Sequence, residues 1–329
     1  ASSRSANAFS DSAAALFAAQ ASSCSHRSHA VQEVRRDAKA ANLRGNELYR
    51  RGDLSAAARE YDRGRLLALG IDDREMVAES LNNMGLLLSA AGDFAGAKRK
   101  YEEALGINEE IGNARGRAAN LVNRGDLSIS TGDLLSAEAD LEEARSLYRS
   151  LLDRHGEAAA ENVLGLAVFE GGDAERGRRL VEGALTTAFS MKRHRLAAAC
   201  LANLGRMHER EGRLDDALSA YLRALTEDKT VENAAGIGSD LAGAGGVLAS
   251  MGRLPEAKEH LERALAVHTQ LGSIEGMLSD LRLLAGVASR QGDRASEIEF
   301  KKRIDELEKD PATMTASKRK GRETLVPRP

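Results

Sequence analysis

Residues 82–113 read NNMGLLLSAAGDFAGAKRKYEEALGINEEIGN, and the order of small and large residues in this stretch decides the fold. A turn pair, Gly92 and Asp93, stands between a small residue, Gly85, and a large one, Tyr101. Glycine suits the left-handed conformation that ends a helix, and the aspartate after it can cap the next helix. Spacings of three, four and seven residues keep side chains on one helical face. The stretch therefore predicts two antiparallel helices that pack closely across a short turn.

The same pattern returns along the chain every 40 residues without an insertion or deletion. The turn glycine recurs seven times, at Gly52, Gly92, Gly132, Gly172, Gly212, Gly252 and Gly292. The small residue seven positions earlier is a glycine in all but the last repeat, at Gly45, Gly85, Gly125, Gly165, Gly205, Gly245 and Ala285. Self-similarity at one fixed period is the signature of a repeat array. The chain is thus expected to stack one helix–turn–helix unit many times.

This pattern resembles the tetratricopeptide repeat (TPR) family over roughly residues 38–308. The resemblance implies an all-α, right-handed α-solenoid of seven helix–turn–helix units, or about fourteen helices. The usual TPR period is about 34 residues, and the longer period here is similar to that of Pins-type adaptors and kinesin light chains. In the last repeat Glu297 and Lys301 replace the alanine and the aromatic residue, as expected of a terminal unit with a polar outer face.

Composition divides the chain into three parts. We expect an Ala/Ser-rich, partly disordered N-terminal extension at residues 1–36, the superhelix at 37–309, and a basic disordered tail at 310–329. Two interpretations of residues 1–30 stay open, since this composition suits an organellar transit peptide as well as an ordinary disordered tail.

The charge balance and the apolar content exclude several classes of function. A formal net charge of −3 argues against general binding to nucleic acid or to a membrane surface. No stretch approaches the 18 apolar residues of a membrane span. The two cysteines, Cys24 and Cys200, are not expected to form a structural disulfide. We predict a cytoplasmic protein, with the cytoskeleton or a cilium as possible sites, and proteins as its partners.

No sequence motif predicts catalysis, a metal or a cofactor. Cys24, His26 and His29 lie within six residues, but a zinc site needs four ligands. The segment GIGSDLAGAGG at residues 236–246 lacks the Lys-Ser/Thr of a phosphate-binding loop, and the repeat register places it inside a helix. We therefore expect no catalytic residues, and no cofactor-binding or metal-binding residues.

Candidate partner-binding residues come from the register of the first helix in each repeat. In TPR arrays this helix lines the concave face, which directs Asn83, Asn123 and Asn203 into the groove, followed by Arg206 and Arg210. An asparagine side chain both donates and accepts hydrogen bonds, so it can hold an extended peptide backbone. The alternative is that these asparagines bridge neighbouring helices or only face water.

Two packing features also follow from the register. Ala97 and Ala257 are predicted to be buried where two helices touch. Residues 236–251 carry five glycines, which either weaken this helix or let a neighbouring helix or a partner approach unusually closely.

The sequence thus favours a non-catalytic scaffold or adaptor that binds a partner segment in the concave groove. The alternative is a structural subunit of a large cytoskeletal or ciliary assembly, in which the convex face and the tails would matter more than the groove.

Overall fold

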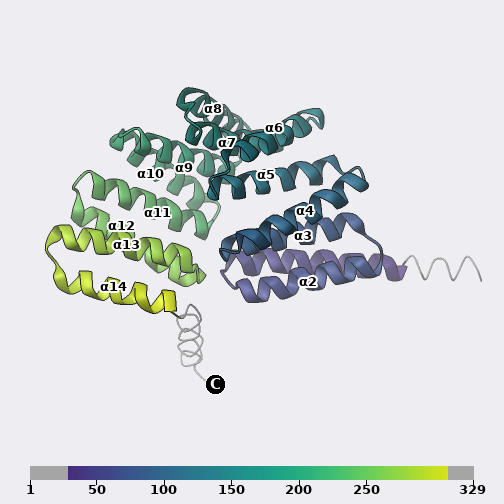
Figure 1. Cartoon of the computed structure of the whole chain (residues 1–329), viewed down its shortest axis with the longest axis horizontal. Coiled ribbons are helices and arrows are strands. Elements are labelled where there is room, and N and C mark those ends of the chain that lie inside the picture. Colours follow the sequence, from purple (N-terminus) through teal and green to yellow (C-terminus); the bar gives the residue numbers. More distant parts are fainter. Residues whose placement is uncertain (1–28, 310–329) are drawn as a thin grey trace, which may run out of the picture.

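The computed structural model describes residues 29–309, which fold into an all-α solenoid (Figure 1). Within this range the first helix spans residues 29–50. The others are α2 (Leu54–Gly70), α3 (Arg74–Ala90), α4 (Phe94–Glu110), α5 (Ala114–Ser130), α6 (Leu134–Ser150), α7 (Arg154–Glu170), α8 (Ala174–Ser190), α9 (His194–Arg210), α10 (Leu214–Thr230), α11 (Ala234–Ser250), α12 (Leu254–Leu271), α13 (Ile274–Gln291) and α14 (Arg294–Lys309). They form the seven predicted helix–turn–helix units, and residues 29–36 of the expected extension already belong to the first helix.

The repeat period is built from two halves of equal length. All helices from α2 to α11 have the same number of residues, and they begin at one constant interval, half of the repeat period. The turn glycines within the repeats all have positive φ, from 74° to 104°. The turns between repeats adopt the same left-handed conformation, although Asp72, Leu152, Lys192 and Glu232 occupy four of them. Both kinds of turn therefore share one backbone geometry, and only the turn within a repeat always carries glycine.

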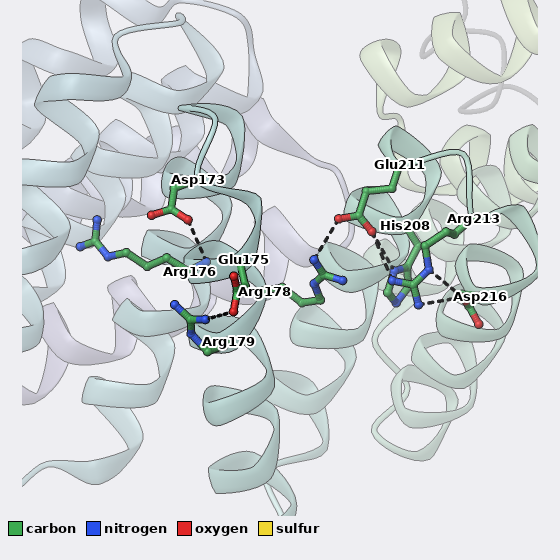
Figure 2. A network of polar contacts seen from close by, with 9 residues as sticks. All are labelled: Asp173, Glu175, Arg176, Arg178, Arg179, His208, Glu211, Arg213 and Asp216. Atoms are coloured by element: carbon green, nitrogen blue, oxygen red, sulfur yellow. Dashed lines mark hydrogen bonds and ion pairs between the residues drawn. The ribbon is translucent and has the colours of Figure 1, made fainter.

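The aspartate after the turn glycine caps the following helix, as predicted. Asp93 accepts a hydrogen bond from the backbone N–H of Gly96 at 2.8 Å. Figure 2 shows the same cap at Asp173 and its replacement one repeat later by Arg213. Arg213 makes no cap and instead donates to Asp216 at 2.9 Å.

Small and large residues fit together between the two helices of a repeat. A Cβ atom on Gly85 would collide with the ring of Tyr101, so the glycine makes the room that the tyrosine fills. Ala97 and Ala257 are fully buried, which confirms the prediction for both. A large residue of the next repeat completes such a contact, since Leu127 packs in one cluster with Ala97 and Tyr101.

The glycines of α11 mostly mark close approach to neighbouring helices. Added Cβ atoms at Gly236, Gly238, Gly243 and Gly245 would meet Asp228, His268, Tyr221 and Leu261, respectively. Only Gly246 has open space around it. The structure therefore favours the second interpretation of this segment for four of its five glycines. It also confirms that residues 236–246 form part of a helix.

One register between successive repeats carries buried polar pairs. Asn108 of α4 donates to Asn120 of α5 at 2.6 Å. Three repeats further on, the same positions hold two buried carboxyl groups, Asp228 and Asp240, which are 3% and 2% exposed. In the next repeat they hold His268 and Asp280, 2.6 Å apart.

The repeats follow one another around an arch, and the two ends of the arch meet (Figure 1). A Cβ atom on Gly52 would overlap the carbonyl of Leu271, so the turn of the first repeat lies against the end of α12. No helix among residues 29–309 has both the length and the apolar character to cross a membrane.

The predictions for residues 1–28 and for the basic tail at 310–329 lie outside the described residues.

Candidate functional site

The concave face carries a hollow of about 800 Å³ formed by α5, α7 and α9. These are the first helices of the third, fourth and fifth repeats, which is the face that the repeat register predicts. Four of the five candidate residues line this hollow together: Asn123, Asn203, Arg206 and Arg210. Asn123 belongs to the third repeat and the other three belong to the fifth. The fourth repeat lies between them in the sequence, so the superhelix brings them to one place.

Two hydrogen bonds between asparagine side chains, here called the ladder, link neighbouring repeats at this hollow. Asn123 donates its side-chain N–H to Asn82 at 2.8 Å, and Asn203 donates to Asn162 at 3.0 Å. Each bond joins one repeat to the next at a separation of 41 residues. The alternative interpretation, that these asparagines bridge neighbouring helices, therefore holds for the side-chain nitrogens of Asn123 and Asn203. Among the described residues no hydrogen bond engages the carbonyl oxygen of Asn123 or Asn203.

Charges of both signs surround the asparagines. Arg206 and Arg210 lie one turn apart on α9 and are both exposed. Arg210 faces Glu170 of α7 at 3.7 Å, a distance at which a partner's carboxylate can compete for the guanidinium. Asp126 of α5 is close enough to Arg206 for the positive charge of the arginine to favour ionisation of the Asp126 carboxyl.

Asp126 shows how far the superhelix encloses this face. Its side chain is open to solvent, yet partial desolvation by the surrounding walls raises the pKa of its carboxyl, and the positive charge of Arg206 opposes this shift. The charge of Asp126 in turn adds to the effect of burial in raising the pKa of Tyr49, a residue of the first repeat. The charge of Asp126 in the third repeat thus acts on Tyr49 in the first.

Asn83, the fifth candidate, lies elsewhere. It is buried on α3, its amide nitrogen has no hydrogen-bond partner within the described residues, and it does not line the hollow. Its register is that of Asn123 and Asn203, but the neighbouring helices cover it.

Sequence reasoning missed Asn82 and Asn162, the two acceptors of the ladder. Asn82 and Asn162 occupy the same position in repeats that are two apart, and each stands one residue before the position predicted to face the groove. A search for hydrogen-bonding residues at separations of one repeat period, or one position more, would have found both pairs.

Comparisons with known proteins agree with this fold. Family models described as tetratricopeptide repeat match residues 77–111, 199–235 and 243–271. No curated protein sequence matches the chain significantly. These three segments of the chain are tetratricopeptide repeats, and the paired helices of the whole array agree with that assignment. The finer resemblance to Pins-type adaptors and kinesin light chains stays a prediction.

Solved structures with the same arrangement have low sequence identity. A Rap protein complexed with Competence and Sporulation Factor matches with a TM-score of 0.67 at 17% identity, covering 84% of this chain and 76% of that one. NprR in complex with its cognate peptide NprX gives 0.62 at 17%, covering 88% and 83%. Aspartyl phosphate phosphatase F from Bacillus subtilis gives 0.60 at 10%, covering 86% and 73%. At these identities the likeness establishes the fold.

Proposed function

We propose that this protein is a non-catalytic interaction scaffold that holds a short, extended segment of a partner protein in the groove between α5, α7 and α9. The observation that carries the proposal is the convergence of Asn123, Asn203, Arg206 and Arg210 on one hollow. These four residues were selected from the repeat register alone.

The hydrogen bonds of the ladder specify what the asparagines offer to a partner. The side-chain nitrogens of Asn123 and Asn203 are fixed by their bonds to the preceding repeat. Each carbonyl oxygen is left to accept a backbone N–H from a peptide. Because the ladder holds both side chains in place, binding costs little of their conformational entropy.

The charges define the partner segment further. Two arginines, Arg206 and Arg210, share the groove with two acids, Asp126 and Glu170. A segment with an acidic residue near the arginines would replace the loose contact between Arg210 and Glu170 with a closer one. Val163 and Leu166 add an apolar wall on α7, so we expect an acidic residue next to apolar ones.

The comparisons support binding of a peptide. One of the similar structures, NprR, holds its cognate peptide NprX, and another, a Rap protein, is complexed with Competence and Sporulation Factor. A third similar structure is that of an aspartyl phosphate phosphatase. The experiment below therefore includes a phosphatase assay.

Affinity purification of the full chain, followed by mass spectrometry, would identify the partner, and overlapping synthetic peptides would locate the bound segment. The segment is then titrated calorimetrically into the wild type, into Asn123→Ala/Asn203→Ala and into Arg206→Gln. Arg223→Gln is the matched control, since Arg223 is an exposed arginine on the opposite helix layer. The same preparations are assayed for release of phosphate from an acyl phosphate.

Each groove variant should weaken binding, by about 1 kcal/mol for each hydrogen bond lost, while the control binds as the wild type does. Unchanged binding by both groove variants would refute the groove. Co-purification only with large complexes and no binding of any peptide would favour the alternative, a structural subunit of a cytoskeletal or ciliary assembly. Phosphate release above that of the buffer would refute a purely non-catalytic role.

A further inference from the structure

A second hollow lies where the two ends of the arch meet, and it shares no lining residue with the groove of α5, α7 and α9. Its volume is about 780 Å³, within the range of roughly 300–1,000 Å³ that is typical of small-molecule sites. One wall comes from the first two repeats and includes Tyr49, Leu54 and Phe94. The opposite wall comes from the last repeats and includes Leu271 and Ile274. The two walls thus belong to opposite ends of the repeat array.

The contact between the ends closes one side of this hollow. Gly52 has a φ of +76°, and the space that its Cβ would occupy is taken by the backbone of Leu271. A larger residue at position 52 would push the two ends apart. The hollow therefore exists only while the first and the sixth repeats stay together.

The lining combines exposed apolar surface with positive charge. Tyr49, Leu54, Leu271 and Ile274 are half-buried, and Phe94 is 38% exposed, so apolar surface remains open to a ligand. Burial of such surface contributes about 25 cal/mol per Å². The walls thus favour a ligand with an apolar body.

Three arginines from three different helices line the same hollow, against a single acidic lining residue, Glu275. Arg50 pairs with Glu47 at 2.5 Å, and Arg282 pairs with Glu308 at 2.8 Å. Arg195 makes no ion pair with any residue of the described chain. Its charge does act on the buried carboxyl of Asp228, where it opposes the rise in pKa that burial causes. Arg195 is therefore the cation with the most capacity left for an acidic ligand.

From this juxtaposition we propose that the hollow is a binding site for a small anionic amphiphile, a molecule with one acidic group and an apolar body. The acidic group pairs with Arg195, and the body lies between Phe94 and Ile274. Because such a ligand contacts both ends of the arch, its binding holds the superhelix closed. The proposal does not depend on peptide binding in the other groove.

The probe for this site is the sulfonate dye 8-anilinonaphthalene-1-sulfonate, titrated into the full chain and followed by fluorescence. One saturable equivalent should bind, and decanoate should displace it up to about fivefold more effectively than the uncharged decanol, as expected for one exposed ion pair. Arg195→Gln and Phe94→Ala should each weaken dye binding by about that factor. Arg223→Gln and Leu135→Ala are the controls, a distant exposed arginine and a leucine that is 85% exposed.

Closure is measured on the same samples by hydrogen exchange, with circular dichroism to confirm that each variant is folded. Saturating decanoate should slow exchange at residues 47–54 and 270–278 together. The proposal is overturned if the dye binds both pocket variants as it binds the wild type, if decanol competes as well as decanoate, or if Leu135→Ala removes the binding. Unchanged exchange at the two ends would overturn the bridging of the arch.

Discussion

Replacing Asp240 with asparagine should remove much of the pH dependence of this protein's stability. Asp240 of α11 is 2% exposed and faces a second buried carboxyl group, Asp228 of α10. One oxygen of Asp240 has no hydrogen-bond partner within the described chain, whereas Asp228 accepts a hydrogen bond from Asn233 at 2.9 Å. The interface between the fifth and sixth repeats therefore tolerates Asp240 best when it is protonated.

The size of the effect follows from the pKa. Burial, with the charge of Asp228 as a second cause, raises the pKa of Asp240 from 3.8 to about 8. Because the folded protein holds this proton more tightly than the unfolded chain does, the contribution of Asp240 to stability is fully present below pH 3.8 and is lost as the pH rises towards 8. At 1.36 kcal/mol per pKa unit, Asp240 costs about 3–4 kcal/mol between pH 5 and pH 8. This is an upper value, since the two carboxyl groups titrate together.

The assay is urea unfolding followed by circular dichroism at pH 5, 6, 7 and 8. The free energy of unfolding of the wild type should fall relative to that of Asp240→Asn, and the difference should grow with pH. Asp215→Asn is the matched control, since Asp215 is an exposed acid on α10, and its curve should run parallel to that of the wild type. If the wild type and Asp240→Asn differ by a constant amount across this range, the assignment of a protonated Asp240 is wrong.

Three further substitutions test the packing, each measured as the free energy of unfolding. Ala97→Leu should cost about 1–3 kcal/mol because it overpacks a fully buried contact, and an unchanged value would contradict the repeat register. Gly246→Ala should stabilise the protein by about 0.5–1 kcal/mol, since open space surrounds this glycine. Gly245→Ala should destabilise it through a clash with the adjacent helix. Equal effects of the two substitutions would refute the interpretation that the glycines of α11 mark close approach to neighbouring helices. Leu152→Gly should stabilise by up to about 1 kcal/mol because Leu152 has a φ of +55°, and any loss of stability would count against the shared turn geometry.

The helices and their pairing could be predicted because each repeat carries its own signals. Gly92 ends one helix, Asp93 caps the next, and Gly85 and Tyr101 fit together between them. The turns between repeats carry this signal less regularly, because Leu152 adopts the same left-handed conformation that Gly112 adopts in another of these turns. The helices on either side impose that conformation, which sequence propensity does not reveal. Asp73, Asn113 and Asp153 nevertheless cap the helices that follow such turns.

The candidate site could be predicted only in part, for a similar reason. Asn123 and Asn203 of the predicted register line the hollow, whereas local packing buries Asn83 of the same register. Partner binding by any of the three stays a prediction. The meeting of Gly52 with Leu271 depends on the small rotation from each repeat to the next, summed over the whole array. No single stretch of sequence encodes that sum.

The most direct test of the central claim is the affinity of an identified partner segment for the wild type and for Asn123→Ala/Asn203→Ala. We predict that the double variant binds about thirtyfold more weakly, from two lost hydrogen bonds to the partner of about 1 kcal/mol each. Its melting temperature should fall modestly, because Asn123 and Asn203 also donate hydrogen bonds to the preceding repeat. Equal affinities for the wild type and the double variant would contradict the claim that this groove holds the partner.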